Sequence, residues 1–153
     1  MNGTPPTDPH AGVAAAFKQA REMSGLSQRE LASTLGTSSR AIQAIEAEDR
    51  ALFADYSPAE VKLIAEALGV APEWLLNCEC GEPALGGAEL LELIREGAQG
   101  NPRAVEEFEL HVGWRVAPLL ASPERLLAEV TVEALRGLLT ALEIDWRRAV
   151  AGL

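Results

Sequence analysis

The chain has 153 residues, of which 48% are hydrophobic and 24% charged, and its formal net charge is −10. This size and balance are typical of a soluble globular protein with one or two small domains. No apolar run reaches the roughly 18 residues that a membrane span needs, and the first ten residues lack the basic flank and apolar segment of a signal peptide. We therefore expect a cytoplasmic protein with no membrane partner.

Metal and redox chemistry have little support in the sequence. Cys78 and Cys80 are the two cysteines, and their spacing is too short for a comfortable structural disulfide. The only histidines are His10 and His111, so a zinc site would lack ligands. There is also no Gly-rich phosphate loop and no HExxH motif. We predict no metal, no cofactor, no catalytic residues and no enzymatic activity.

The periodicity of apolar residues predicts an all-α fold. No alternating run suggests a strand, and aromatic residues make up only 5% of the chain. We expect a disordered tail at 1–8, a first domain at 9–78, a linker at 79–87 and a second helical region at 88–153. Lys18 and Lys62 are the only lysines beside many arginines, which suggests a GC-rich bacterial genome.

The first domain is organised around Gln28 to Ala47, which reads as two short helices joined by a tight turn. Leu31 and Leu35 mark the apolar face of the first helix, and Ile42 and Ile45 mark that of the second. Gly36 falls where the first helix must end in a left-handed residue. Ser38 can then cap the second helix.

Three further helices complete the predicted first domain. One runs from about Pro9 to Ser24 with Phe17 facing inward, another begins at Ser57-Pro58, and the last covers about Pro72 to Leu76. Trp74 and Leu75 are expected to anchor that last helix in the core. This gives five helices before the predicted linker.

The second region is predicted to contain three to five helices. Leu90, Leu91 and Ile94 mark the first of them. Asn101-Pro102 starts the next, whose apolar stripe continues to Leu119. Further helices are expected after Ser122-Pro123, after Thr131 and from Trp146 to Val150.

Several separated motifs together resemble one family. They are LSQRELA at 26–32, LGTS at 35–38, AIQAIE at 41–46 and ALGVAPEWLLN at 67–77, with Arg21 preceding them. Residues 13–77 therefore resemble the Cro/XRE-type, lambda-repressor-like helix-turn-helix domain of phage repressors and bacterial transcription regulators. The resemblance implies double-stranded DNA as the partner, with the helix that follows Ser38 lying in the major groove.

Roles for individual residues follow from the resemblance. Arg40 would read guanine with its two-pronged guanidinium, Gln43 could pair with adenine, and the serines would contact phosphate. Arg21 and Glu46 would form a buried structural ion pair between two helices. The residues assigned to DNA binding are Gln28, Arg29, Ser38, Ser39, Arg40, Gln43 and Arg50.

The segment after Glu46 departs from the family pattern. A glycine and basic residues are usual there, whereas this chain has Ala47-Glu48-Asp49-Arg50. The connection that follows is also longer, and its apolar residues predict packing, an extension of the preceding helix or an interface. The candidate interface residues are Leu52, Phe53, Tyr56, Leu135, Leu138, Leu139 and Leu142.

Two functions remain open at this stage. The first is a sequence-specific transcriptional regulator of the repressor type, which acts as a homodimer on a palindromic operator with its second region dimerising or binding a protein partner. The second is an acidic protein-interaction module, such as an antitoxin, an anti-repressor or a modulator of another regulator. The net charge of −10 motivates the second, because DNA binding depends on basic residues that displace counterions.

Overall fold

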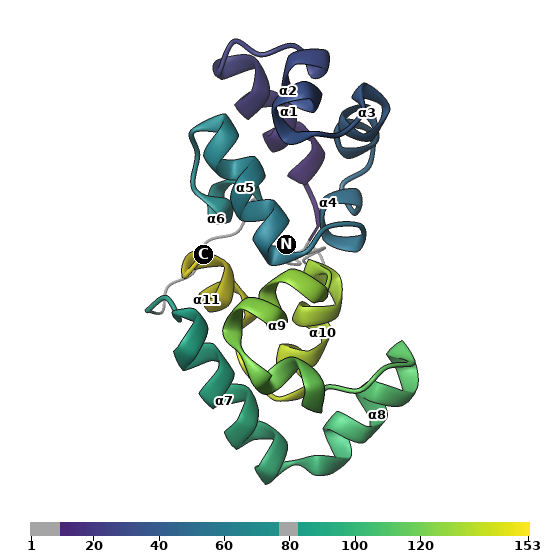
Figure 1. Ribbon diagram of the computed structural model, residues 1–153, viewed down its shortest axis with the longest axis vertical. Helices are drawn as coiled ribbons and strands as arrows, with labels where there is room; N and C mark the ends of the chain where they lie inside the picture. The colour runs from purple at the N-terminus through teal and green to yellow at the C-terminus, as the bar shows by residue number, and fades with distance from the viewer. Residues whose placement is uncertain (1–9, 77–82) are drawn as a thin grey trace, which may run out of the picture.

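A computed structural model describes residues 10–76 and 83–153, and all regular elements of these two stretches are helical (Figure 1). The predicted all-α fold is confirmed. The predicted tail at 1–8, Pro9 at the predicted start of the first helix, Cys78 and Cys80 lie outside the described residues, as do residues 79–82 of the predicted linker.

Six helices form the N-terminal unit: α1 (Val13–Met23), α2 (Gln28–Leu35), α3 (Ser39–Ala47), α4 (Ala51–Ala54), α5 (Pro58–Leu68) and α6 (Pro72–Leu75). Capping boxes at Ser27/Glu30 and Ser57/Glu60 start α2 and α5. The first helix begins later than predicted, because Gly12 is left-handed (φ 81°) and the Val13 N–H bonds the carbonyl of His10 in a turn. The core of this unit includes Phe17, Leu31, Ile42 and Ile45, all almost fully buried.

The longer connection after α3 forms the short helix α4, so the unit has six helices where the sequence predicted five. Leu52 and Phe53 on α4 are completely buried. The prediction that Trp74 lies in the core is wrong. Trp74 is 40% exposed on α6, whereas Leu75 and Leu76 beside it are buried. A four-residue helix has room to bury only one side, and the two leucines occupy it.

The C-terminal unit contains α7 (Gly87–Gly100), α8 (Pro102–Val112), the 3₁₀ helix η1 (Ala117–Ala121), α9 (Pro123–Glu129), α10 (Val132–Ala141) and α11 (Trp146–Ala151). The side chains of Asn101, Ser122 and Thr131 cap α8, α9 and α10, as their positions predicted. The prediction that one helix continues from Asn101-Pro102 to Leu119 is wrong. Gly113 adopts a left-handed conformation (φ 81°), so α8 ends at Val112 and Leu119 lies on η1.

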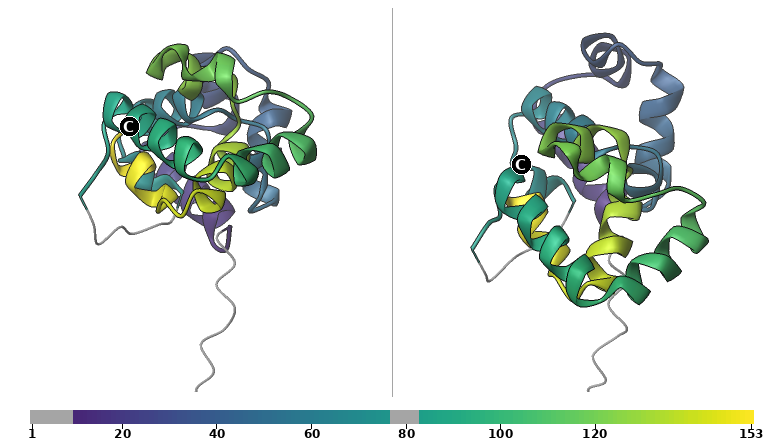
Figure 2. Two further views of the ribbon diagram at one scale, coloured as in Figure 1. Left: turned by 90° about the horizontal axis from the view of Figure 1, so that it is seen from below. Right: turned by 60° about the horizontal axis from the view of Figure 1, so that its bottom comes forward.

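The two units pack directly against each other. Figure 1 shows α9, α10 and α11 beneath the N-terminal helices, and in the two views of Figure 2 the helices of the two units still lie against each other. The Val132 N–H donates to the carbonyl of Tyr56 at 2.8 Å, and His10 Nε2 lies 2.6 Å from Glu133 Oε2. Phe53 contacts the indole of Trp146 edge to face, with 5.8 Å between ring centroids. The C-terminal unit therefore completes the core of the N-terminal unit.

The candidate interface residues are used within the chain. Leu52, Phe53, Leu135, Leu138 and Leu139 are buried, and Tyr56 and Leu142 are partly covered. The five buried side chains are therefore not available to a second chain in this conformation. Within residues 10–76 and 83–153, we find no helix with the length and apolarity needed to cross a bilayer.

Candidate nucleic-acid interface

Helices α2 and α3 form a helix-turn-helix pair whose turn depends on small and capping residues. Ala32 is buried where the two helices pack, and Gly36 ends α2 with a φ of 68°. The Ser38 hydroxyl accepts from the Ala41 N–H at 3.2 Å and starts α3. Because these features fix the turn, the orientation of α3 follows from local sequence.

The two faces of α3 differ sharply. Ile42 and Ile45 are buried beneath it. Arg40, Gln43 and Ala44 are exposed on the outside, so the chain presents its predicted base-reading residues to solvent. Ser39 is half-buried at the start of the helix, and Ser38 already uses its hydroxyl oxygen as a cap.

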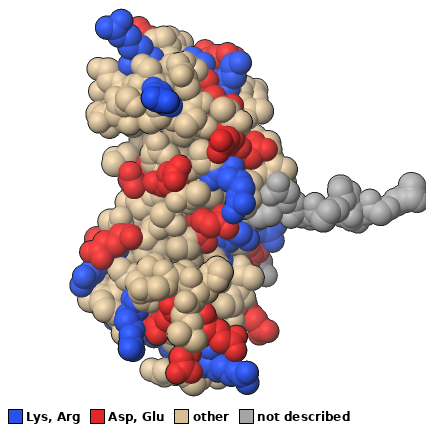
Figure 3. All heavy atoms as spheres, turned by 90° about the vertical axis from the view of Figure 1, so that its right-hand side faces the viewer, with Lys and Arg blue, Asp and Glu red and all other residues tan. Residues whose placement is uncertain are grey.

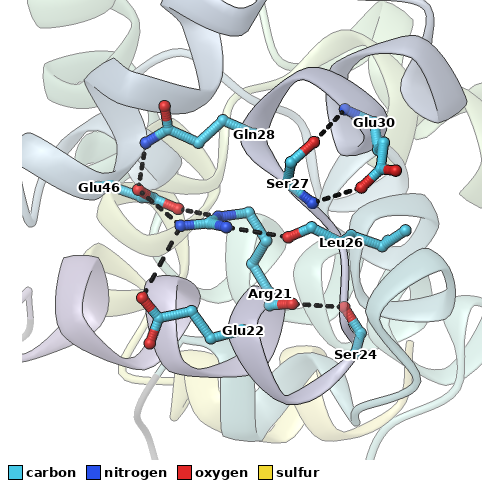
Figure 4. Close-up of polar contacts among 8 residues, drawn as sticks. All are labelled: Arg21, Glu22, Ser24, Leu26, Ser27, Gln28, Glu30 and Glu46. Atoms are coloured by element: carbon cyan, nitrogen blue, oxygen red, sulfur yellow. Dashed lines mark hydrogen bonds and ion pairs between the residues drawn. The ribbon is translucent and has the colours of Figure 1, made fainter.

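Arg21 and Glu46 form an ion pair between α1 and α3, as the resemblance implied (Figure 4). Arg21 Nε donates to Glu46 Oε1, and its Nη1 donates to the carbonyl of Leu26 at 2.9 Å. Both side chains are at least nine-tenths buried. The pair therefore holds α3 against α1. The bond from Arg21 to the Leu26 carbonyl also connects α1 to the segment that precedes α2.

Gln28 belongs to the same network. Its Nε2 donates to Glu46 Oε2 at 2.6 Å, which connects the first residue of α2 to α3. Figure 4 shows the amide oxygen pointing away from the network. The sequence assigned Gln28 to DNA alone, whereas the structure also gives it a partner within the protein.

The pKa of Glu46 reflects this environment. Burial raises the pKa, but hydrogen bonds from Arg21 and Gln28 and the positive charges of Arg21 and Lys18 outweigh it and hold the pKa below its ordinary value. Glu46 is consequently a carboxylate at neutral pH. Its negative charge is matched inside the protein and is not presented to DNA.

The acidic residues after α3 have separate positions. Asp49 Oδ1 accepts from the Ala14 N–H at 2.9 Å and so caps the first turn of α1 from a distant part of the chain. Glu48 is exposed, and so is Arg50 immediately before α4. Sequence reasoning missed the role of Asp49, because nothing in the local pattern shows that the turn after α3 reaches the start of α1.

The charges near α2 and α3 are sparse and mixed. Arg29, Arg40 and Arg50 are exposed, and Glu30 and Glu48 are exposed near them in sequence. Figure 3 shows one side of the molecule, on which acidic and basic side chains are interspersed and no continuous basic band covers the end that carries these helices. Electrostatic attraction to phosphate would therefore rest on these arginines and on the exposed Lys18.

Residues 14–79 match a family described as a helix-turn-helix domain. The match covers α1 to α6, somewhat under half of the chain, and agrees with the resemblance seen in the sequence motifs. Neither the curated proteins nor the solved structures contain a match to the chain.

Proposed function

We propose that the protein is a sequence-specific DNA-binding transcription regulator of the repressor type, working in the bacterial cytoplasm without enzymatic activity. The observation that carries the proposal is the exposed face of α3, where Arg40 and Gln43 project from a helix whose other side is fixed by Ile42 and Ile45. A helix held in this way can enter the major groove with its polar side chains toward the base edges.

We further propose that the protein binds as a homodimer to a palindromic operator. One such helix spans only a few base pairs, whereas a symmetric pair would read two half-sites about 34 Å apart. The dimer would use a surface other than Leu135, Leu138 and Leu139, because these side chains are buried within the chain. Sedimentation of the full chain with and without its operator tests this, and a monomer bound to a single half-site would contradict it.

Selection of bound fragments from genomic DNA by the purified full chain tests the main proposal. The expected result is one enriched palindromic site. Arg40→Ala should then lose about 5- to 160-fold in discrimination at one base pair, since a bidentate contact to guanine supplies about 1–3 kcal/mol. Arg115→Ala is the matched control, because Arg115 is exposed in the C-terminal unit. Unchanged selectivity in Arg40→Ala would overturn α3 as the reading helix.

The second candidate is the protein-interaction module, and the mixed charges around α3 favour it. In that case Glu48 and the exposed face of α3 would contact a partner protein, as in an antitoxin, an anti-repressor or a modulator, or the partner would bind the C-terminal helices. The same selection experiment separates the candidates. Recovery of no preferred sequence at low salt, from a folded sample, would support this second function.

A further inference from the structure

An open groove of about 630 Å³ lies between α8 and α10 and reaches Ala54 at the end of α4. Its volume falls within the range of about 300–1,000 Å³ that is usual for small-molecule sites. The groove is thus lined by both units of the protein. None of its lining residues belongs to α3.

Most residues that line the groove are apolar. Phe108 and Val112 line it from α8, and Phe108 is held by an edge-to-face contact with Trp114 at 5.4 Å. The opposite wall on α10 is made of small residues, including Ala134 and Gly137. A Cβ added at Gly137 would meet the ring of Phe108 at 3.4 Å, so the glycine lets this ring approach the backbone of α10.

Three titratable side chains line this groove: Glu107, Glu133 and His111. No lysine or arginine lines it among the described residues. Glu133 is matched by His10 at 2.6 Å and by Arg136. Glu107 pairs with Arg103 at 3.1 Å, but the two side chains are 66% and 86% exposed, and such a pair is weak in water. Glu107 therefore offers a negative charge at the edge of an apolar surface.

We propose that this groove binds an apolar organic cation, with the positive charge beside Glu107 and the apolar body against Phe108, Val112 and the small residues of α10. The combination of an apolar floor and a carboxylate at the rim favours this class over neutral or anionic compounds of the same shape. The inference concerns a second site and does not depend on DNA binding.

A pair of probes with the same shape and opposite charge tests the proposal. Tetraphenylphosphonium and tetraphenylborate are titrated separately into the full chain by calorimetry, and the residues that respond are identified from amide chemical shifts in NMR spectra. The expected result is saturable binding of the phosphonium, at least tenfold tighter than the borate, with the largest shifts in α8 and α10. Equal affinity for both ions, or shifts centred elsewhere, would overturn the proposal.

Variants locate the site and separate charge from shape. Glu107→Gln should weaken phosphonium binding about fivefold, which is the size expected of one partly exposed charge interaction. Gly137→Leu should block the groove and abolish binding, with Ala104→Leu as a second filling variant if the first fails to fold. Leu110→Ala is the control, because Leu110 is 84% exposed on α8 and does not line the groove.

Full affinity in a folded filling variant would refute the site. A dimer that dissociates when the phosphonium binds would also refute the proposal, because the groove would then be the contact with a second copy of the chain.

Discussion

Arg21 and Glu46 illustrate how much of the helix-turn-helix unit depends on single buried charges. Each is at least nine-tenths buried, and each has further partners: the Leu26 carbonyl for the guanidinium and the Gln28 amide for the carboxylate. Removing one member leaves the other charged and buried without a partner, which lowers the free energy of unfolding strongly. Replacing both members with apolar residues of similar volume would change it much less. The two residues were identified from the family resemblance, since their spacing alone does not reveal an interhelical contact.

Glu46→Ala is expected to lower the free energy of unfolding by about 3–5 kcal/mol. Urea denaturation measures the loss. Glu22→Ala is the matched control: Glu22 lies 4.0 Å from the same guanidinium, but its side chain is 59% exposed. The control should change stability by less than about 0.5 kcal/mol. Similar losses in both variants would show that Arg21 does not depend on its buried partner.

The pH dependence of stability follows from the lowered pKa of Glu46. A carboxyl group whose pKa is lower in the folded state contributes stability above its unfolded pKa, and this contribution disappears as pH falls through the folded value. The wild-type protein should therefore lose stability below about pH 4.5, and Glu46→Gln should show a shallower loss over the same range. Glu133 and Asp145, whose pKa values are also lowered, should preserve part of the slope in the variant. Urea midpoints between pH 3 and 7 test this, and identical slopes would contradict it.

At the level of helices, the sequence predicted capping side chains better than the length of an apolar stripe. Serine, threonine and asparagine caps were read correctly because a cap acts within three residues of itself. The continuation of α8 to Leu119 was wrong because apolar spacing persisted beyond Gly113, whose left-handed conformation ends the helix. The sequence did not decide whether the segment that forms α4 packs internally, extends α3 or makes an interface. Its internal packing depends on a distant residue, since Phe53 contacts Trp146.

The contact between Asp49 and α1 gives a prediction at this level. Asp49→Ala should lower the free energy of unfolding by about 1 kcal/mol, because the Ala14 N–H loses a charged acceptor at the start of the helix. Glu48→Ala is the control, since Glu48 is exposed and next in sequence. Thermal denaturation followed by circular dichroism measures both. Equal effects would mean that the acidic residues after α3 act only through surface charge.

Over the whole molecule, each unit has its own hydrophobic core, and the two units pack against each other. Val132 and Val150 belong to the core of the N-terminal unit, and Trp146 contacts the cores of both units. The sequence predicted separate domains because a Gly- and Pro-containing segment divides two sets of helical patterns. It could not predict their packing, which depends on side chains more than 70 residues apart, such as Phe53 and Trp146.

The shared core predicts that both units unfold together. Trp146→Ala should lower the free energy of unfolding by about 2–3 kcal/mol, less than a fully buried tryptophan, because Trp146 is only half-buried. Hydrogen exchange of the slowest amides in α5 and in α8 should then accelerate by the same factor, since they exchange through the same global opening. Trp74→Ala, at a 40% exposed position, should leave the free energy of unfolding and these exchange rates nearly unchanged. Faster exchange confined to α10 and α11 would instead show that the C-terminal unit opens alone, and that contacts such as His10 with Glu133 can break without unfolding α1.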